Sequence, residues 1–183
     1  MRTYVALLRG INVGGRHALR MADLRAMLQS LGLRNVLTYI QSGNAVFRGD
    51  DTVAPADLSH KISAVINASH GFEPRVLVLT ADEFQAAVDA NPFPEAESEP
   101  RSLHLNFLGT TPVTPDLAGL DALRAAGERF ALKGNLFYLH APDGIGRSKL
   151  AGAVEKLLGV EATSRNWRTV QKIMSLVTET SGE

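Results

Sequence analysis

The sequence contains no cysteine, which excludes disulfides, thiolate metal sites and cysteine nucleophiles. Long hydrophobic runs are missing too: no stretch approaches the roughly 18 apolar residues that a membrane-spanning helix needs. The start of the chain, MRTYVALLRG, has an apolar run too short for a signal peptide. We therefore expect a cytoplasmic protein that has no membrane partner.

An excess of charge of one sign is also absent. The 19 basic residues balance the 19 acidic ones, so the formal net charge is zero. Proteins that bind nucleic acid generally carry a strong positive excess, and this balance disfavours that class. A chain of 183 residues, 45% of them hydrophobic, is long and apolar enough to bury a core.

The first half of the chain predicts the order strand, helix, strand, strand, helix, strand. Apolar and β-branched runs predict the strands, helical spacing of apolar residues predicts the helices, and Gly32 is expected to end the first helix. The strands are expected at residues 3–8, 35–41, 44–48 and 74–79, and the helices begin at Met21 and Pro55. This is the order of a ferredoxin-like unit.

The same order repeats after a connecting segment. Thr80 and Glu83 form a capping-box pair for a short helix, and an acidic, proline-rich stretch follows at 92–100. The second set is expected as a strand at 102–109, a helix at 115–126, a hairpin at 128–132 and 135–140, a helix at 148–159, a short strand at 160–164 and a final helix at 166–179.

The two predicted hairpins, IQSGNAVFR and ALKGNLFYLH, both place Gly-Asn at the turn, which indicates an internal duplication. The predicted fold class is therefore α+β, with two ferredoxin-like units and an extra C-terminal helix. The predicted domains are residues 1–80, a linker helix and acidic linker at 81–100, and residues 101–183.

The stretch RGINVGG, residues 9–15, is the first feature that indicates a ligand. In this topology the end of the first strand and the turn at residues 41–44 lie at the same edge of the sheet, so the two should be neighbours. Backbone N–H groups of a glycine loop, with arginines beside them, suit a phosphate or carboxylate. The alternative is that Asn12 and Asn44 only satisfy the backbone of tight turns.

Two more clusters place cations near helix starts. Arg147 and Lys149 lie in PDGIGRSKL, and Arg165 and Arg168 flank Asn166, a plausible N-cap, in TSRNWRT. A cation at a helix N-terminus is unfavourable unless an anion lies between it and the amides, although exposed arginines cost little there. Both clusters fall on one edge of the second unit, and we expect an interdomain cleft between that edge and RGINVGG. The predicted ligand-binding residues are Arg9, Asn12, Gly14, Gly15, Arg16, Ser42, Asn44, Arg147, Lys149, Arg165 and Arg168.

No motif assigns a reaction. The P-loop spacing is absent, no paired histidines indicate a metal site, and no G-x-S-x-G elbow indicates a serine hydrolase. His17 is the one histidine beside a glycine loop, and Ser42, Ser148 or Tyr39 could orient a ligand. No catalytic residue, metal or cofactor is assigned.

The motifs LRGINVGG, MADLR, TYIQSGNAVF, GIGRSKL and TSRNWRTVQKI together resemble the bacterial family called domain of unknown function 1697. The resemblance covers essentially the whole chain in the right order. It implies a two-part α/β protein of ferredoxin-like character and brings no activity, substrate or cofactor.

Three functions remain open from the sequence. The chain could bind an anionic small molecule such as a nucleotide or a phosphorylated metabolite, with or without catalysis. It could bind nucleic acid on its ferredoxin-like sheets, although KGNLFYLH carries Asn135 where the RNA-recognition pattern has an aromatic residue. It could also be a structural or interaction protein whose polar loops serve the fold alone.

Overall fold

A computed structural model describes residues 1–182 of the chain. It forms two compact units, one made of Met1–Ala86 with the chain from Lys172 onward and the other of Ala87–Gln171. Both boundaries fall inside helices, and the predicted division into 1–80, 81–100 and 101–183 stays a prediction. Each unit is built on its own four-stranded antiparallel sheet.

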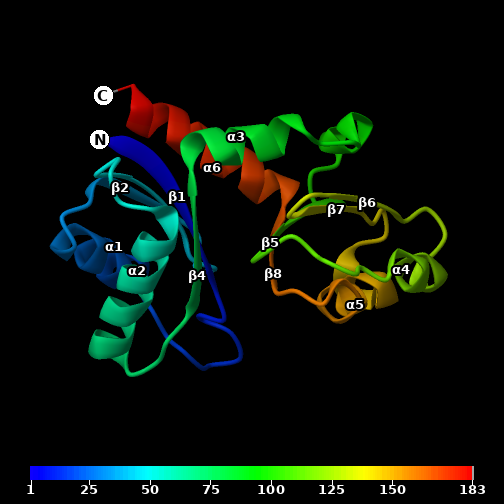
Figure 1. The fold of residues 1–183 in the computed structure, drawn as a ribbon, viewed down its shortest axis with the longest axis horizontal. Helices are drawn as coiled ribbons and strands as arrows, with labels where there is room; N and C mark the ends of the chain where they lie inside the picture. The colour runs from blue at the N-terminus through cyan, green and yellow to red at the C-terminus, as the bar shows by residue number, and fades with distance from the viewer. Residues whose placement is uncertain (183) are drawn as a thin grey trace. The chain divides into compact units, whose positions relative to one another are not determined.

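The first unit has the predicted order of strands and helices (Figure 1). Its strands are β1 (Arg2–Arg9), β2 (Arg34–Tyr39), β3 (Asn44–Gly49) and β4 (Arg75–Thr80), and its helices are α1 (Met21–Ser30) and α2 (Pro55–His70). The sheet order is β2-β3-β1-β4, with β1 antiparallel to both β3 and β4. This is the ferredoxin-like topology.

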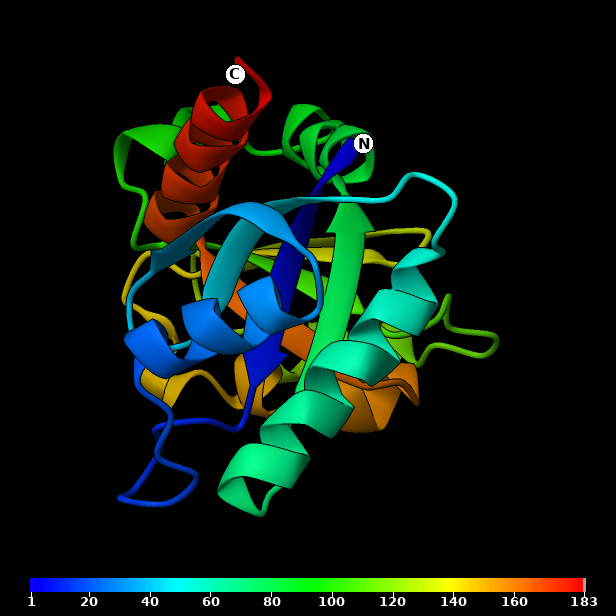
Figure 2. The same ribbon diagram turned by 90° about the vertical axis from the view of Figure 1, so that its left-hand side faces the viewer.

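Helices α1 and α2 cover one face of this sheet (Figure 2). Alternate residues of the central strands, Tyr4 and Ala6 of β1 and Phe47 of β3, pack beneath them and are fully buried. The predicted helix spacing supplies the other side of this core, with Leu24 and Leu28 from α1 and Leu58, Ile62 and Ile66 from α2. Burying these side chains contributes about 1.5–3 kcal/mol each relative to exposure.

The second unit repeats the arrangement (Figure 1). Its elements are β5 (Leu103–Leu108), α4 (Leu117–Leu123), β6 (Arg129–Lys133), β7 (Leu136–His140), α5 (Lys149–Leu158) and β8 (Ala162–Asn166). The sheet order β6-β7-β5-β8 matches that of the first unit position by position. Phe137 and Leu139 of β7 pack with Leu120 of α4 and Leu150 of α5 in the core.

Helix α3 (Ala81–Asp89) and the short 3-10 helix η1 (Pro94–Ser98) follow β4, and α6 (Trp167–Ser181) ends the fold. The predicted capping box is present: Thr80 N donates to Glu83 Oε2 at 2.8 Å, and Glu83 N donates to Thr80 Oγ1 at 3.2 Å. The last strand of the second unit lies two residues later than the predicted 160–164, because pairing with β5 runs from Ala162 to Asn166.

The predicted α+β fold class with two ferredoxin-like units, duplicated along the chain, is confirmed. Both hairpin turns use glycine at positive φ, +83° at Gly43 and +58° at Gly134. The asparagine after each glycine is absent from the positive-φ residues, and Asn44 is the first residue of β3.

Candidate functional site

The loop after β1 and the turn between β2 and β3 lie side by side in the first unit, as the topology predicts. Leu8 N donates to Gly43 O at 2.8 Å, and Asn12 Nδ2 donates to Gln41 O at 2.8 Å. A Cβ atom on Gly43 would lie 2.7 Å from both Ile11 Cδ1 and Leu8 Cβ. The turn needs glycine here for its backbone conformation and for this close approach.

The two asparagines of this region bond to backbone. Asn12 Oδ1 accepts from Leu19 N and its Nδ2 donates to Leu19 O, both at 2.8 Å, which closes the loop. Asn44 is fully buried and donates to Tyr39 O at 2.9 Å and Ser42 Oγ at 3.1 Å. These contacts match the alternative in which both amides satisfy tight turns.

The remaining residues of the first cluster lie at the surface of the loop. Gly14, Gly15 and Arg16 are exposed, Ser42 is exposed in the turn, and Arg9 is half-buried at the end of β1. His17 adopts a φ of +53°, its Nδ1 lies 2.8 Å from Gly10 O, and its ring stacks on Phe72 with centroids 4.6 Å apart. The hydrogen bond and the stacking hold the His17 ring in one orientation.

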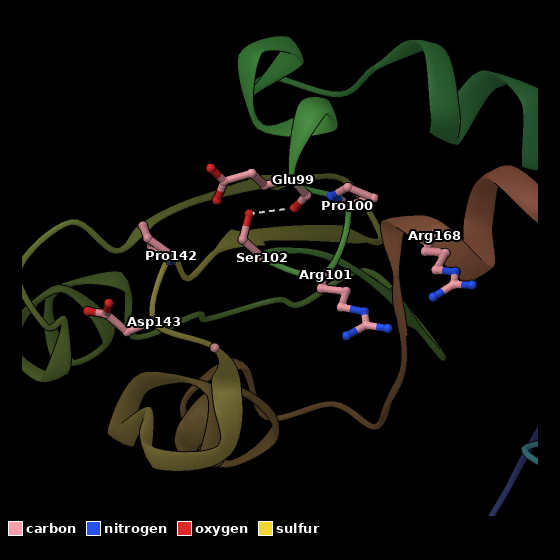
Figure 3. Close-up of a pocket in the computed structure, with 8 residues that line it drawn as sticks. Glu99, Pro100, Arg101, Ser102, Pro142, Asp143 and Arg168 are labelled. Carbon is pink, nitrogen blue, oxygen red and sulfur yellow. Dashed lines mark hydrogen bonds between the residues drawn. The ribbon is translucent and has the colours of Figure 1, made fainter.

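A pocket of about 640 Å³ lies at one edge of the sheet in the second unit (Figure 3). Three segments far apart in the chain line it: residues 99–102 before β5, residues 142–144 after β7, and Arg168 at the start of α6. They meet because β5 is antiparallel to both β7 and β8, so its start lies beside their ends. The Gly134 turn lies at the opposite end of the sheet.

Backbone hydrogen bonds tie the walls of the pocket together. Arg168 N donates to Pro100 O at 3.2 Å, Ala141 N to Ser102 O at 2.8 Å, and Gly144 N to Ala141 O at 2.9 Å. Ser102 Oγ donates to Glu99 O at 2.8 Å. Gly144 closes the turn after β7 with a φ of +82°, a value that favours glycine. The pocket is therefore built on strand ends and bonded turns.

Four charged side chains line the pocket: Arg101, Arg168, Glu99 and Asp143. All four are exposed. Within the described chain, none of these four side-chain charges makes a hydrogen bond or an ion pair. The pocket thus offers two guanidinium groups and two carboxylates to whatever enters it.

A smaller pocket of about 260 Å³ adjoins this one and shares Glu99 and Pro142 with it. Glu95 and His140 also line it. Arg129 bonds to the Glu95 carboxylate and lies 3.1 Å from His140 Nδ1. The hydrogen bond from Arg129 lowers the pKa of Glu95, and burial, aided by the Arg129 charge, lowers the pKa of His140.

The other predicted residues of the second unit lie outside these pockets as far as the structure describes them. Arg147 and Lys149 are exposed, in a single 3-10 turn and at the first residue of α5. Arg165 lies in β8 with 9% of its surface exposed, and burial lowers its pKa to about 10. Ser148 caps α5 by accepting from Ala151 N at 3.0 Å, and Asn166 Oδ1 accepts from Thr169 N at 2.9 Å.

Of the charged residues that line this pocket, Arg168 is among the predicted ligand-binding residues, and Arg101, Glu99 and Asp143 are not. A signal for Arg101 was present, since it directly precedes a buried strand whose start must lie at the same edge as GIGRSK. The prediction of an acidic linker up to residue 100 draws attention away from this relation.

Among residues 1–182, no group of three or more histidine, aspartate or glutamate side chains could hold a metal ion. No helix in this range is long and apolar enough to cross a membrane.

Comparisons with known proteins place the chain in a family. Residues 1–138 match the family model described as protein of unknown function (DUF1697). The conserved bacterial protein SP0830 from Streptococcus pneumoniae is similar in structure, with a TM-score of 0.69 and 26% identity over 96% of this chain and 98% of that one. No curated protein matches the sequence. The chain belongs to the DUF1697 family of proteins of unknown function.

Proposed function

We propose that this protein binds an anionic small ligand, bearing phosphate or carboxylate, in the pocket of the second unit. The observation that carries the proposal is the pair Arg101 and Arg168, whose guanidinium groups line one pocket and have no ion partner among the described residues. Guanidinium groups bind carboxylate and phosphate with two parallel hydrogen bonds, so two arginines suffice to hold one anionic group.

The burial of the sheet aromatics disfavours nucleic-acid binding. Phe47, Phe137 and Tyr138 are fully buried, and the Tyr138 hydroxyl donates to Ala87 O at 2.6 Å. An RNA-recognition sheet instead presents its aromatic residues to unstacked bases.

A structural role suits the first-unit loop better than a ligand does. The Asn12 amide bonds to Leu19 and Gln41, and Gly43 is required by a close approach. Of the predicted residues, Arg9, Gly14, Gly15, Arg16, Ser42, Arg147, Lys149 and Arg165 stay candidates, and the interdomain cleft stays a prediction.

Thermal-shift screening of the whole chain tests the proposal, with inorganic phosphate, sugar phosphates, nucleotides and small carboxylates at matched ionic strength. A ligand at 100 times its dissociation constant adds about 2.7 kcal/mol, a shift of several degrees. For the best probe, we expect Arg101→Gln or Arg168→Gln to weaken binding about two- to fivefold, the range of an ion pair between exposed groups.

Lys156→Gln is the control, because Lys156 is exposed on α5, carries the same charge and lies outside the pocket. It should leave binding unchanged. If no anion shifts the melting temperature, or if the arginine variants bind as well as the control, the proposal is wrong.

A further inference from the structure

The two signs of charge in the pocket are separated in space. In Figure 3 the guanidinium groups of Arg101 and Arg168 lie on one side of Ser102, and the carboxylates of Glu99 and Asp143 lie on the other. No salt bridge links the two pairs among the described residues. The arginines therefore form one side of the pocket, and the two carboxylates lie apart from each other on the other side (Figure 3).

The smaller pocket extends the acidic side. It shares Glu99 with the main pocket and adds Glu95, while its one histidine, His140, is held beside the Arg129 guanidinium. Arg129 is bonded to Glu95 and stacks over Phe93 at 4.7 Å from the ring centroid, so its guanidinium group already has partners within the protein. The Glu99 carboxylate has no such cation bonded to it.

A simple anion fits this lining poorly. The two arginines attract it, and the carboxylates of Glu99 and Asp143 repel it, so the lining as a whole carries no net charge. A ligand with a positive group at its other end turns that repulsion into attraction. Such a lining discriminates between the two kinds of ligand, because the carboxylates weaken the binding of a plain anion and strengthen the binding of a zwitterion.

We propose that the ligand is zwitterionic, with a phosphate or carboxylate at Arg101 and Arg168 and an ammonium group beside one of the carboxylates, Glu99 or Asp143. This inference rests on the proposed function, because it needs the arginines to hold the anionic end. The class includes amino acids and amino-alkyl phosphates.

Isothermal titration of the full chain with matched probes tests this assignment. Phosphoethanolamine carries both groups, ethyl phosphate lacks the ammonium, and ethanolamine lacks the phosphate; 4-aminobutanoate, butanoate and butylamine form the carboxylate set. One exposed carboxylate should add about two- to fivefold in affinity. We expect one zwitterion to bind about two- to fivefold more tightly than its plain anion and the amines not to bind.

Variants locate the effect in the pocket. Asp143→Asn or Glu99→Gln, whichever removes the carboxylate beside the ammonium group, should bring the zwitterion's affinity toward that of the plain anion and leave the plain anion's affinity unchanged or improved. Arg168→Gln should weaken both ligands. Glu73→Gln, at an exposed position of the first unit, is the control and should change neither.

The possible outcomes separate this inference from the proposed function. If plain anion and zwitterion bind equally, and both depend on Arg168, the inference is overturned and the proposed function stands. If a zwitterion binds without depending on Arg168, Asp143 or Glu99, the site is elsewhere and the inference fails. If no probe of either kind binds, the inference fails, and the thermal-shift screen with its wider set of anions decides the proposed function separately.

Discussion

Asn12 and Asn44 show that a residue type suited to binding a ligand can serve the fold instead. Both lie in turns where an anion site was predicted, and both bond their amides to nearby backbone. Asn12 also adopts a φ of +53°, which asparagine tolerates better than most residues. Composition alone does not separate these roles, because local backbone bonding is what makes asparagine common in turns.

The matched turns of the two units allow a residue-scale prediction. Gly43 and Gly134 both have positive φ, but only Gly43 lacks space for a Cβ atom, and no atom lies within 4 Å of one built on Gly134. We expect Gly134→Ala to lower the free energy of unfolding by about 1–2 kcal/mol through its φ. Gly43→Ala should cost about 1–3 kcal/mol more, because it overpacks Leu8 and Ile11.

Urea denaturation of both variants measures the difference. Equal losses would show that the contact of Gly43 with the loop after β1 is not tight in solution.

Ser148 is informative at the scale of an element. It stands in GIGRSKL, where sequence reasoning gave it a part in orienting a ligand, and the structure makes it the N-cap of α5. Because Ser148 caps α5, replacing it should destabilise the protein without changing what the pocket binds. The residue does not line either described pocket.

We therefore expect Ser148→Ala to lower the free energy of unfolding by about 0.5–2 kcal/mol, and Ser148→Gly by only a few tenths. Urea denaturation gives the stability, and titration of the best anion gives the affinity. A loss of affinity in the glycine variant with little loss of stability would contradict the capping role and return Ser148 to the ligand site.

Two histidines, His104 and His140, make the stability of the whole molecule depend on pH. His104 is 7% exposed on β5, which lies between β7 and β8, and burial lowers its pKa. The pKa of His140 is lowered by burial and by Arg129. A histidine whose folded pKa is lowered takes up a proton on unfolding, so its stabilising contribution is complete above the unfolded pKa of about 6.5 and is lost as pH falls below it.

We expect the free energy of unfolding to fall between about pH 7.5 and about pH 5.5, above the range where carboxylates with unfolded pKa values of roughly 4 contribute. His104→Gln should reduce this pH dependence, and adding His140→Gln should reduce it further, whatever the absolute stability of each variant. Denaturant unfolding at the two pH values measures it. An unchanged slope in the double variant would contradict the assignment.

Much of the molecule follows from the sequence because its causes are local. Alternating and helical spacing of apolar residues, Pro55 at a helix start and glycine in both hairpins determine the elements and their repeated order. The order of elements in turn implies that the RGINVGG loop meets the Gln41 turn, and the hydrogen bond from Asn12 to Gln41 confirms it. The capping box is likewise predictable from the sequence, since Thr80 and Glu83 are three residues apart.

Tertiary structure alone decided the candidate site. The pocket draws on residues 99–102, residues 142–144 and Arg168, which are distant in sequence and meet only because the start of β5 lies beside the ends of β7 and β8. Tertiary structure also decided which cations are available: it buried Arg165 in β8 and left Arg168 lining the pocket, although both flank Asn166. Neighbouring residues on a strand point to opposite faces, and a helix start redirects the chain, so closeness in sequence does not tell which charge faces a ligand.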